Sequence, residues 1–472
     1  MTAAGDQAVA AGQIQTWGYD PGTPDAPHGL IVCPQPDLAA APLPTQIIGQ
    51  APAPDADTSP GTPAFRYWVA AEALRRGSDL WGAAIGSGAK WNPAVGAVLP
   101  VELDAGEDLN AYYNRQALRF FHEEVRGVTV YSGGSPCVAT HEQGHGVLDA
   151  VRPQLWDTPF AEVAALHEAF GDISSMLCGL QLEPIREAVI EQTGGRVRTD
   201  SVLSRCAEQL GWAVRQLIPD SVDATALRNA ANSWFYRDPA GLAPRGPASQ
   251  LCSEPHSFSR VFSGSFLSAL GGMFFLHGDK TPAGLLAVSA DGAKLLHGAV
   301  ATAPVVPAYM SQVAAHMVAL DMQQFGGTYR RALLGSFVNY GILSLPSVHA
   351  VGPGATPDDL SQDEPDVQQV ALPRDAFGLR GDLLVDVPVQ ARRFGVAGSL
   401  PDIGSATVPG PERATASFVE DLFRRGRIAI GEAADPDAPL MPQGRTKSHE
   451  LQETEGGFVL VRRHFDCGFC AE

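Results

Sequence analysis

The sequence predicts an α+β protein with a mainly helical middle region and a small α+β module at its C-terminal end. Short β-branched segments such as Gly127–Tyr131 (GVTVY) occur in the first part of the chain. Longer segments with apolar residues at helical spacing follow, and strands and one helix are mixed after residue 373. A chain of 472 residues with 45% apolar residues has enough material for two or three folded domains.

Residues 1–63 are rich in Ala, Pro, Gly and Asp, which is typical of an extended, linker-like arm. Residues 64–152 are expected to form an α+β lobe. Within these two regions we expect a short strand at Gly29–Cys33, a helix at Phe65–Gly82, a strand at Leu99–Leu103, a helix at Asn110–Glu124, a strand at Gly127–Tyr131 and a helix at Val138–Val151.

Residues 153–345 are expected to form a mainly helical lobe, because apolar residues recur there at helical spacing. The expected helices cover Phe160–Leu180 and roughly 199–217, 257–276, 307–323 and 328–340. Residues 346–472 begin with a Pro- and Asp-rich linker and continue as an accessory module. This module should contain strands at Leu383–Val389 and Gly456–Arg463 and a helix near 412–425.

The net charge of −19 argues against nucleic acid and against anionic membrane surfaces as partners. The N-terminus has no cationic start and no sustained apolar stretch, so no Sec signal peptide is visible, and no apolar run is long enough for a transmembrane helix. Seven scattered cysteines are typical of reduced thiols. We therefore expect a cytoplasmic protein, with export by a non-Sec route left open.

The segment His141-Glu142-Gln143-Gly144-His145 is an H-E-x-x-H motif on a predicted helix. Its spacing places both imidazoles on one helix face, one turn apart, where they can bind the same tetrahedral zinc ion. Glu142 lies beside them and can take a proton from a metal-bound water. The motif predicts a zinc site with His141 and His145 as ligands and Glu142 as general base.

A second helix supplies a candidate third ligand, Glu168, in the segment His167–Ile173 (HEAFGDI). Asp172 follows four residues later on the same face and can accept the second ring N–H of a ligating histidine, which would fix its tautomer. A solvated helix face is the alternative for these two carboxylates. The apolar flanking residues favour a buried site, because an unpaired charge among them is costly.

Together, HEQGH and HEAFGDI resemble the thermolysin-like gluzincins, a family of zinc metallopeptidases with H-E-x-x-H and a later N-E-x-x-x-D. The resemblance covers roughly 105–343 and implies a two-lobed zincin that hydrolyses peptide bonds. Glu254–Ser259 (EPHSFS) is similar to the family segment whose histidine hydrogen-bonds the tetrahedral intermediate, which implies that role for His256. Ala226–Asn229 (ALRN) is similar to the segment whose arginine binds the substrate carbonyl, which implies that role for Arg228.

The resemblance implies Zn²⁺ as cofactor and a peptide or protein as substrate; the oligomeric state is open. His256 as a loop or cap histidine and Arg228 as a surface arginine remain alternatives. The interval between His145 and Glu168 contains no tyrosine, whereas the family has one there that assists the intermediate. A catalytically silent zinc-binding scaffold and a hydrolase of non-peptide amides therefore also remain open. The terminal pair Cys467 and Cys470 is interpreted as a chance or structural pair and not as a redox-active or zinc-binding motif.

Overall fold

The fold was analysed in a computed structural model that describes residues 9–53, 56–350, 365–390, 410–435, 444 and 446–467. This part of the chain is a mixed α+β protein with a helical core, as the sequence predicts. The helices are α1 (Pro63–Ile85), α2 (Pro136–Val151), α3 (Ala161–Gly179), α4 (Glu183–Thr193), α5 (Glu208–Leu217), α6 (Pro255–Leu276), α7 (Pro282–Thr302), α8 (Tyr309–Phe325), α9 (Arg330–Asn339), α10 (Leu345–Ala350) and α12 (Pro411–Arg424).

Helix α2 has clear local start and stop signals. Ser135 caps it, its Oγ accepting a hydrogen bond from the N–H of Val138 at 3.3 Å, and Pro136 occupies the first turn, where a missing N–H costs nothing. Arg152 ends the helix, because Pro153 cannot continue it. All residues of α2 from Pro136 to Asp149 are buried, so that the whole motif helix lies inside the molecule.

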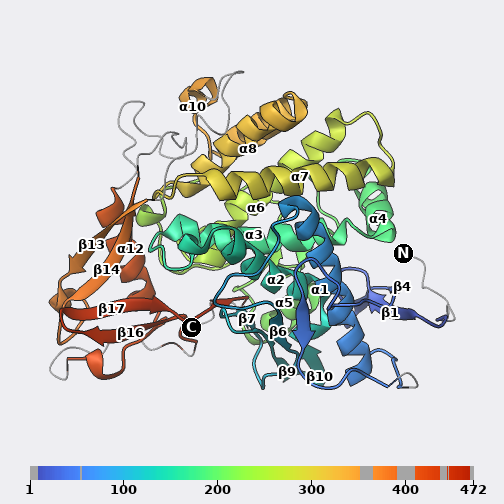
Figure 1. The fold of residues 1–472 in the computed structure, drawn as a ribbon, viewed down its shortest axis with the longest axis horizontal. Helices are drawn as coiled ribbons and strands as arrows, with labels where there is room; N and C mark the ends of the chain where they lie inside the picture. Colours follow the sequence, from blue (N-terminus) through green and yellow to red (C-terminus); the bar gives the residue numbers. More distant parts are fainter. Residues whose placement is uncertain are drawn as a thin grey trace.

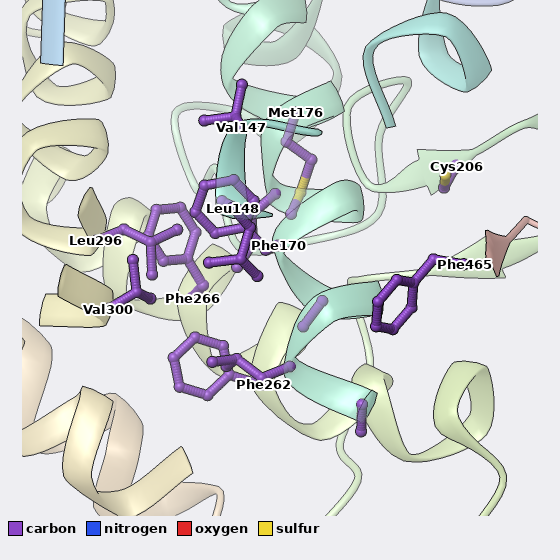
Figure 2. Close-up of a cluster of buried hydrophobic side chains, with 14 of the residues drawn as sticks. Val147, Leu148, Phe170, Met176, Cys206, Phe262, Phe266, Leu296, Val300 and Phe465 are labelled. Carbon is purple, nitrogen blue, oxygen red and sulfur yellow. The ribbon is translucent and has the colours of Figure 1, made fainter. Parts of the chain in front are cut away.

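Helices α2, α3, α6 and α7 surround one continuous apolar core. Figure 2 shows Val147 and Leu148 from α2, Phe170 from α3 and Phe266 from α6 gathered in this core. Fully buried aromatic side chains such as these bury large apolar areas and dominate the stability of a core. The helix that carries the His141–His145 motif therefore packs directly into this core.

The first five-stranded sheet has the order β18-β7-β8-β6-β5. Neighbouring pairs are antiparallel at β18–β7 and β7–β8, and parallel at β8–β6 and β6–β5. Its strands come from three distant parts of the sequence: β5 (Thr45–Ile47) from the segment expected to be an arm, β6 (Leu99–Glu102), β7 (Ala111–Tyr113) and β8 (Leu118–Phe120) from the first lobe, and β18 (Phe465–Asp466) from the C-terminal region.

The helix expected at Asn110–Glu124 is wrong, because this segment forms β7, β8 and β9 (His122–Val125). A turn separates β7 from β8: the Asn114 side chain accepts hydrogen bonds from two backbone N–H groups, and Arg115 adopts a positive φ of 64°. Burial alternates along both strands, which is a period of two and not of 3.6. Alternation over only three residues was too short to be distinguished from a helical pattern.

The second five-stranded sheet has the order β13-β14-β17-β16-β15 and forms one end of the molecule together with α12 (Figure 1). Only β14–β17 and β15–β16 are parallel pairs. The strands and the helix expected after residue 373 are confirmed in this region. Its strands are β13 (Asp366–Leu372), β14 (Leu383–Val389), β15 (Ile428–Ala429), β16 (His449–Thr454) and β17 (Gly457–Arg462).

Short two-stranded pairs complete the described fold. Residues of the expected N-terminal arm form β1 (Gln13–Trp17) and β4 (Leu30–Pro34), which pair antiparallel, and also the pair β2 (Gly22–Thr23) and β3 (Ala26–Pro27). The other two pairs are β9 with β10 (Val128–Tyr131) and β11 (Arg205–Cys206) with β12 (Arg228–Asn229).

Most of the predicted helices are confirmed to within a few residues. The helix expected over roughly 199–217 begins only at Glu208, after β11, and helices α4, α7 and α10 were not expected. Among the described residues, α6 is the one helix long and apolar enough to cross a membrane, and 78% of its most apolar window is buried inside the protein. Burial of this kind is the ordinary state of a core helix.

Candidate metal centre

The structure brings His141 and His145 of α2 together with Glu168 of α3. Nε2 of His141 lies 3.4 Å from Oε2 of Glu168, and Nε2 of His145 lies 3.7 Å from the same oxygen. Three ligands bound at about 2.0–2.2 Å to one tetrahedral ion lie roughly 3.3 Å from one another. The three side chains therefore have the spacing of a metal-binding triad.

These three ligand atoms are buried and lack a hydrogen-bond partner within the described part of the chain. Leaving buried polar atoms unpaired costs free energy, and folded proteins rarely tolerate several at one place without a function. A bound cation would satisfy all three at once. We conclude that this buried His/Glu cluster can hold a metal ion.

Glycine in α3 allows the close approach of the two helices. A Cβ atom placed on Gly171 would lie 2.6 Å from Cε1 of His141, and one on Gly144 would lie 2.9 Å from Cβ of Ser174. Any larger residue at position 171 would push α3 away from the histidine ring. The contact between α2 and α3 thus sets the position of Glu168 relative to the motif.

Asp172 holds the other side of the His141 ring. Its Oδ1 lies 3.1 Å from Nδ1 of His141, so that Nε2 faces the cluster. Burial by itself would lower the pKa of His141, but the contacts with Asp172 and Glu168 raise it to about 9. The structure therefore places Asp172 where the sequence analysis expected it, beside a ligand histidine.

Arg228 lies against Asp172 in the structure. Its Nε is 3.2 and 3.1 Å from the two carboxylate oxygens and its Nη2 is 2.8 Å from Oδ1. Burial would raise the pKa of Asp172, but the guanidinium of Arg228 and the contact with His141 hold it well below its usual range. A two-point contact with a buried carboxylate orients Asp172 as the residue that positions His141.

His167 packs beside His145, the second candidate ligand histidine. The Nδ1 atoms of His145 and His167 are 3.2 Å apart, so that one donates and the other accepts. Burial lowers the pKa of His145 to about 3, and the nearby charges of His141 and His256 act in the same direction, against the opposite effect of Glu168. A histidine that stays neutral is in the form that binds a metal ion.

Glu142 is buried, and both of its carboxylate oxygens lack a hydrogen-bond partner among the described residues. Burial raises the pKa of Glu142 to about 8, and the charge of His141 opposes this shift. A carboxylate that is unpaired next to a candidate metal site is typical of a general base.

His256 reaches the cluster from the N-terminal end of α6. Its Nε2 is 3.2 Å from Oε2 of Glu168, and its Nδ1 is 2.7 Å from Oε1 of Glu254, which also caps the helix by accepting a hydrogen bond from the N–H of Ser257. His256 thus lies beside the third ligand with its ring fixed by Glu254. A cavity lined by residues including Arg228, Glu254 and His256 borders this side of the site.

The C-terminal residues Phe465–Cys467 also reach the site, which the sequence analysis did not anticipate. The ring of Phe465 stacks on that of His167 with 3.8 Å between centroids, and Cys467 is buried near His141 and Glu142. The only sequence signal was the terminal cysteine pair; Cys470 lies outside the described residues. Trp156, in the interval without a tyrosine, packs edge-on against Phe465.

No protein-family model and no curated protein matches the sequence of this chain. The geometry of the site is therefore the basis for assigning a function.

Proposed function

We propose that this protein is a zinc-dependent metallopeptidase of the thermolysin-like gluzincin kind, with the two-lobed arrangement of a zincin. The observation that carries the proposal is the meeting of His141, His145 and Glu168, whose facing atoms are buried and have the spacing of ligands around one ion. Two histidines and a glutamate are the ligand set of a catalytic zinc site that keeps one position open for water or substrate.

A zinc ion held by His141, His145 and Glu168 would supply the Lewis acid that polarises the scissile carbonyl and acidifies the attacking water. Glu142 accepts a proton from the attacking water and passes it to the leaving amine. His256 donates a hydrogen bond to the oxygen on which negative charge develops. One well-placed donor of this kind contributes roughly 3–4 kcal/mol to the stabilisation of the transition state.

Asp172 and Arg228 act through His141 in this proposal. Asp172 holds the ring so that Nε2 points at the metal position, and Arg228 keeps Asp172 ionised and fixed. Such outer contacts raise the basicity of a ligand histidine and hold its tautomer. Arg228 is therefore a positioning residue, whereas the family resemblance implied that it binds the substrate carbonyl.

The test combines elemental analysis of the purified protein with digestion of a peptide library. We expect about one zinc per chain and cleavage of extended peptides. A chain that binds zinc fully but cleaves no peptide would instead be a zinc-binding scaffold, and cleavage confined to non-peptide amides would identify the third candidate function.

A further inference from the structure

The C-terminal strand β18 extends the first sheet at the edge that faces the metal cluster. Phe465 and Asp466 pair antiparallel with Tyr113 and Tyr112 of β7, and the N–H of Cys467 donates to the carbonyl oxygen of Ala111 at 2.9 Å. In Figure 1 the chain crosses to β7 from the second sheet. Addition of an extended segment to a sheet edge is one of the general ways in which proteins bind peptides.

The peptide bond between Asp466 and Cys467 is surrounded by the groups proposed for catalysis. Nε2 of His256 lies 2.5 Å from the carbonyl oxygen of Asp466. The sulfur of Cys467, a ring nitrogen of His141 and a carboxylate oxygen of Glu142 all lie within 4.8 Å of one another. The thiol thus lies beside both a proposed metal ligand and the proposed general base, in the region where the proposed reaction needs the attacking water.

The rest of the segment is anchored by neighbouring parts of the same chain. Nη2 of Arg427 contacts both carboxylate oxygens of Asp466, at 2.8 and 2.6 Å. The guanidinium of Arg462 lies 4.1 Å from the centroid of the Phe465 ring and donates to the carbonyl oxygen of Trp156 at 2.7 Å. Figure 2 shows Phe465 entering beside α3 from the C-terminal strand.

Burial of Phe465, Asp466 and Cys467 is nearly complete, with exposed fractions of 2%, 4% and 1%. This segment is covalently linked to the protein that carries the metal cluster. It therefore competes with free peptides for the space beside the cluster at an effective concentration in the millimolar range. Free substrates at micromolar concentration would rarely displace it.

We propose that Phe465–Cys467 is an intramolecular occupant of the substrate groove, bound in the register of a peptide and keeping the site latent. This inference rests on the proposed peptidase function and describes its regulation. The groove accepts an extended segment with an aromatic residue over His167, an acidic residue paired with Arg427 and a small residue beside Glu142. Displacement of the segment opens the site.

The test measures the binding of a fluorescein-labelled peptide with the sequence of residues 462–468 to the full chain. Every protein carries Glu142→Gln, so that the peptide is not cleaved, and is loaded with zinc. Cys467→Pro removes the N–H that donates to Ala111 and should increase the affinity for the peptide at least about tenfold. Cys467→Ala is the matched control: it removes the thiol but keeps the N–H, and it should raise the peptide affinity much less than Cys467→Pro.

Phe465→Ser provides a second way to release the segment, because it removes the ring from His167. Circular dichroism and zinc content establish that each variant is folded. The inference would be overturned if folded Cys467→Pro and folded Phe465→Ser both bind the peptide with the same affinity as the parent. A wild-type chain whose intact mass shows loss of the residues after Asp466 would overturn it as well, since the segment would then be a substrate.

A measurement on the wild-type chain does not depend on any variant. Cys467 should resist iodoacetamide in the native protein and react readily after unfolding, as read by peptide mapping. Rapid native alkylation of Cys467 would show that the segment does not occupy the groove.

The inference and the proposed function fail in different ways. Cys467→Pro and Phe465→Ser could increase peptide binding and yet cleave no peptide once Glu142 is restored. In that case the segment does occupy the groove, and the proposed peptidase function is wrong. If the wild-type chain cleaves peptides as fast as these two variants, the protein is a peptidase but Phe465–Cys467 does not block its groove.

Discussion

Helix α2 carries two buried carboxylates, Glu142 and Asp149, that differ in their hydrogen-bond partners. Asp149 accepts a hydrogen bond from the hydroxyl of Tyr113 at 2.9 Å and contacts Arg115 through both Nε and Nη2, the latter at 2.5 Å. Glu142 has no hydrogen-bond partner among the described residues, although it is equally buried. Residues of the same chemical type on one helix therefore have different surroundings.

The difference shows how a buried charge can be assigned to structure or to chemistry. A carboxylate whose partners surround it holds elements together, and removing a partner leaves a buried charge uncompensated. A carboxylate without partners costs stability in the folded chain, and a strongly shifted pKa at such a place is typical of a functional site.

Removing a ligand side chain should abolish metal binding. His145→Ala and Glu168→Ala leave two of the three ligands, so elemental analysis should fall from about one zinc per chain to nearly none after dialysis. Asp149→Asn, on the same helix, is the control and should retain the metal. Full zinc content in both ligand variants would remove these residues from the site.

Replacing the unpaired carboxylate should affect turnover and not folding. Glu142→Gln removes the base while keeping the size of the side chain, and should lower kcat by roughly 10²–10⁴, the usual contribution of general acid–base catalysis. Its Tm and zinc content should equal those of the wild type, because Gln has the size of Glu and no hydrogen bond of Glu142 among the described residues is lost. Turnover is measured with a fluorogenic peptide on the Cys467→Pro background. Activity equal to that of the background protein would contradict the proposed mechanism.

Truncating His256 should lower turnover without loss of the metal. His256→Ala removes one donor to the developing oxyanion, so that kcat should fall roughly 10²–10³-fold while KM changes little. The measurement uses the same peptide and background, with zinc content checked. A loss confined to KM would assign His256 to substrate binding in the ground state.

Removing the paired carboxylate of Asp149 should lower the stability of the fold and leave metal binding unchanged. Asp149→Ala leaves Arg115 and Tyr113 without their partner and should lower the free energy of unfolding by about 3 kcal/mol, at the low end for a buried ion pair because Arg115 is partly exposed. Chemical denaturation in urea measures the change. A larger loss of stability in Glu142→Gln than in Asp149→Ala would show that Glu142, and not Asp149, is the carboxylate that stabilises the fold.

The ion pair between His28 and Glu208 should make the stability of the protein depend weakly on pH. Nε2 of His28 lies 3.0 Å from Oε2 of Glu208, at the start of α5. Burial would lower the pKa of His28, but the hydrogen bond and charge of Glu208 raise it overall. The stability from this pair is therefore complete below the unfolded pKa of about 6.5 and is lost as pH rises through the higher folded pKa.

His28→Gln should thus destabilise the protein at pH 5.5 by up to about 1 kcal/mol and have less effect at pH 9. Thermal unfolding of both proteins across this pH range measures the difference. A destabilisation that grows with pH would show that the pKa of His28 is lowered in the folded state.

The sequence by itself determined the helices that build the cluster. Helices α2 and α3 are long and strongly apolar, so their type and approximate bounds follow from local periodicity. The four-residue spacing of His141 and His145 fixes their shared face by helix geometry alone. Zinc as the metal and peptide hydrolysis as the reaction remain proposals drawn from these residues.

Only the tertiary structure decided which groups surround that cluster. Ala111–Tyr113 is a strand because it pairs with β8 on one side and with the distant β18 on the other, and three residues of alternation carry no such information locally. Arg228 lies against Asp172, and Cys467 lies beside Glu142, through contacts between residues far apart in the sequence. Local patterns specify which face of an element is buried, whereas the partner of that face is decided by packing of the whole chain.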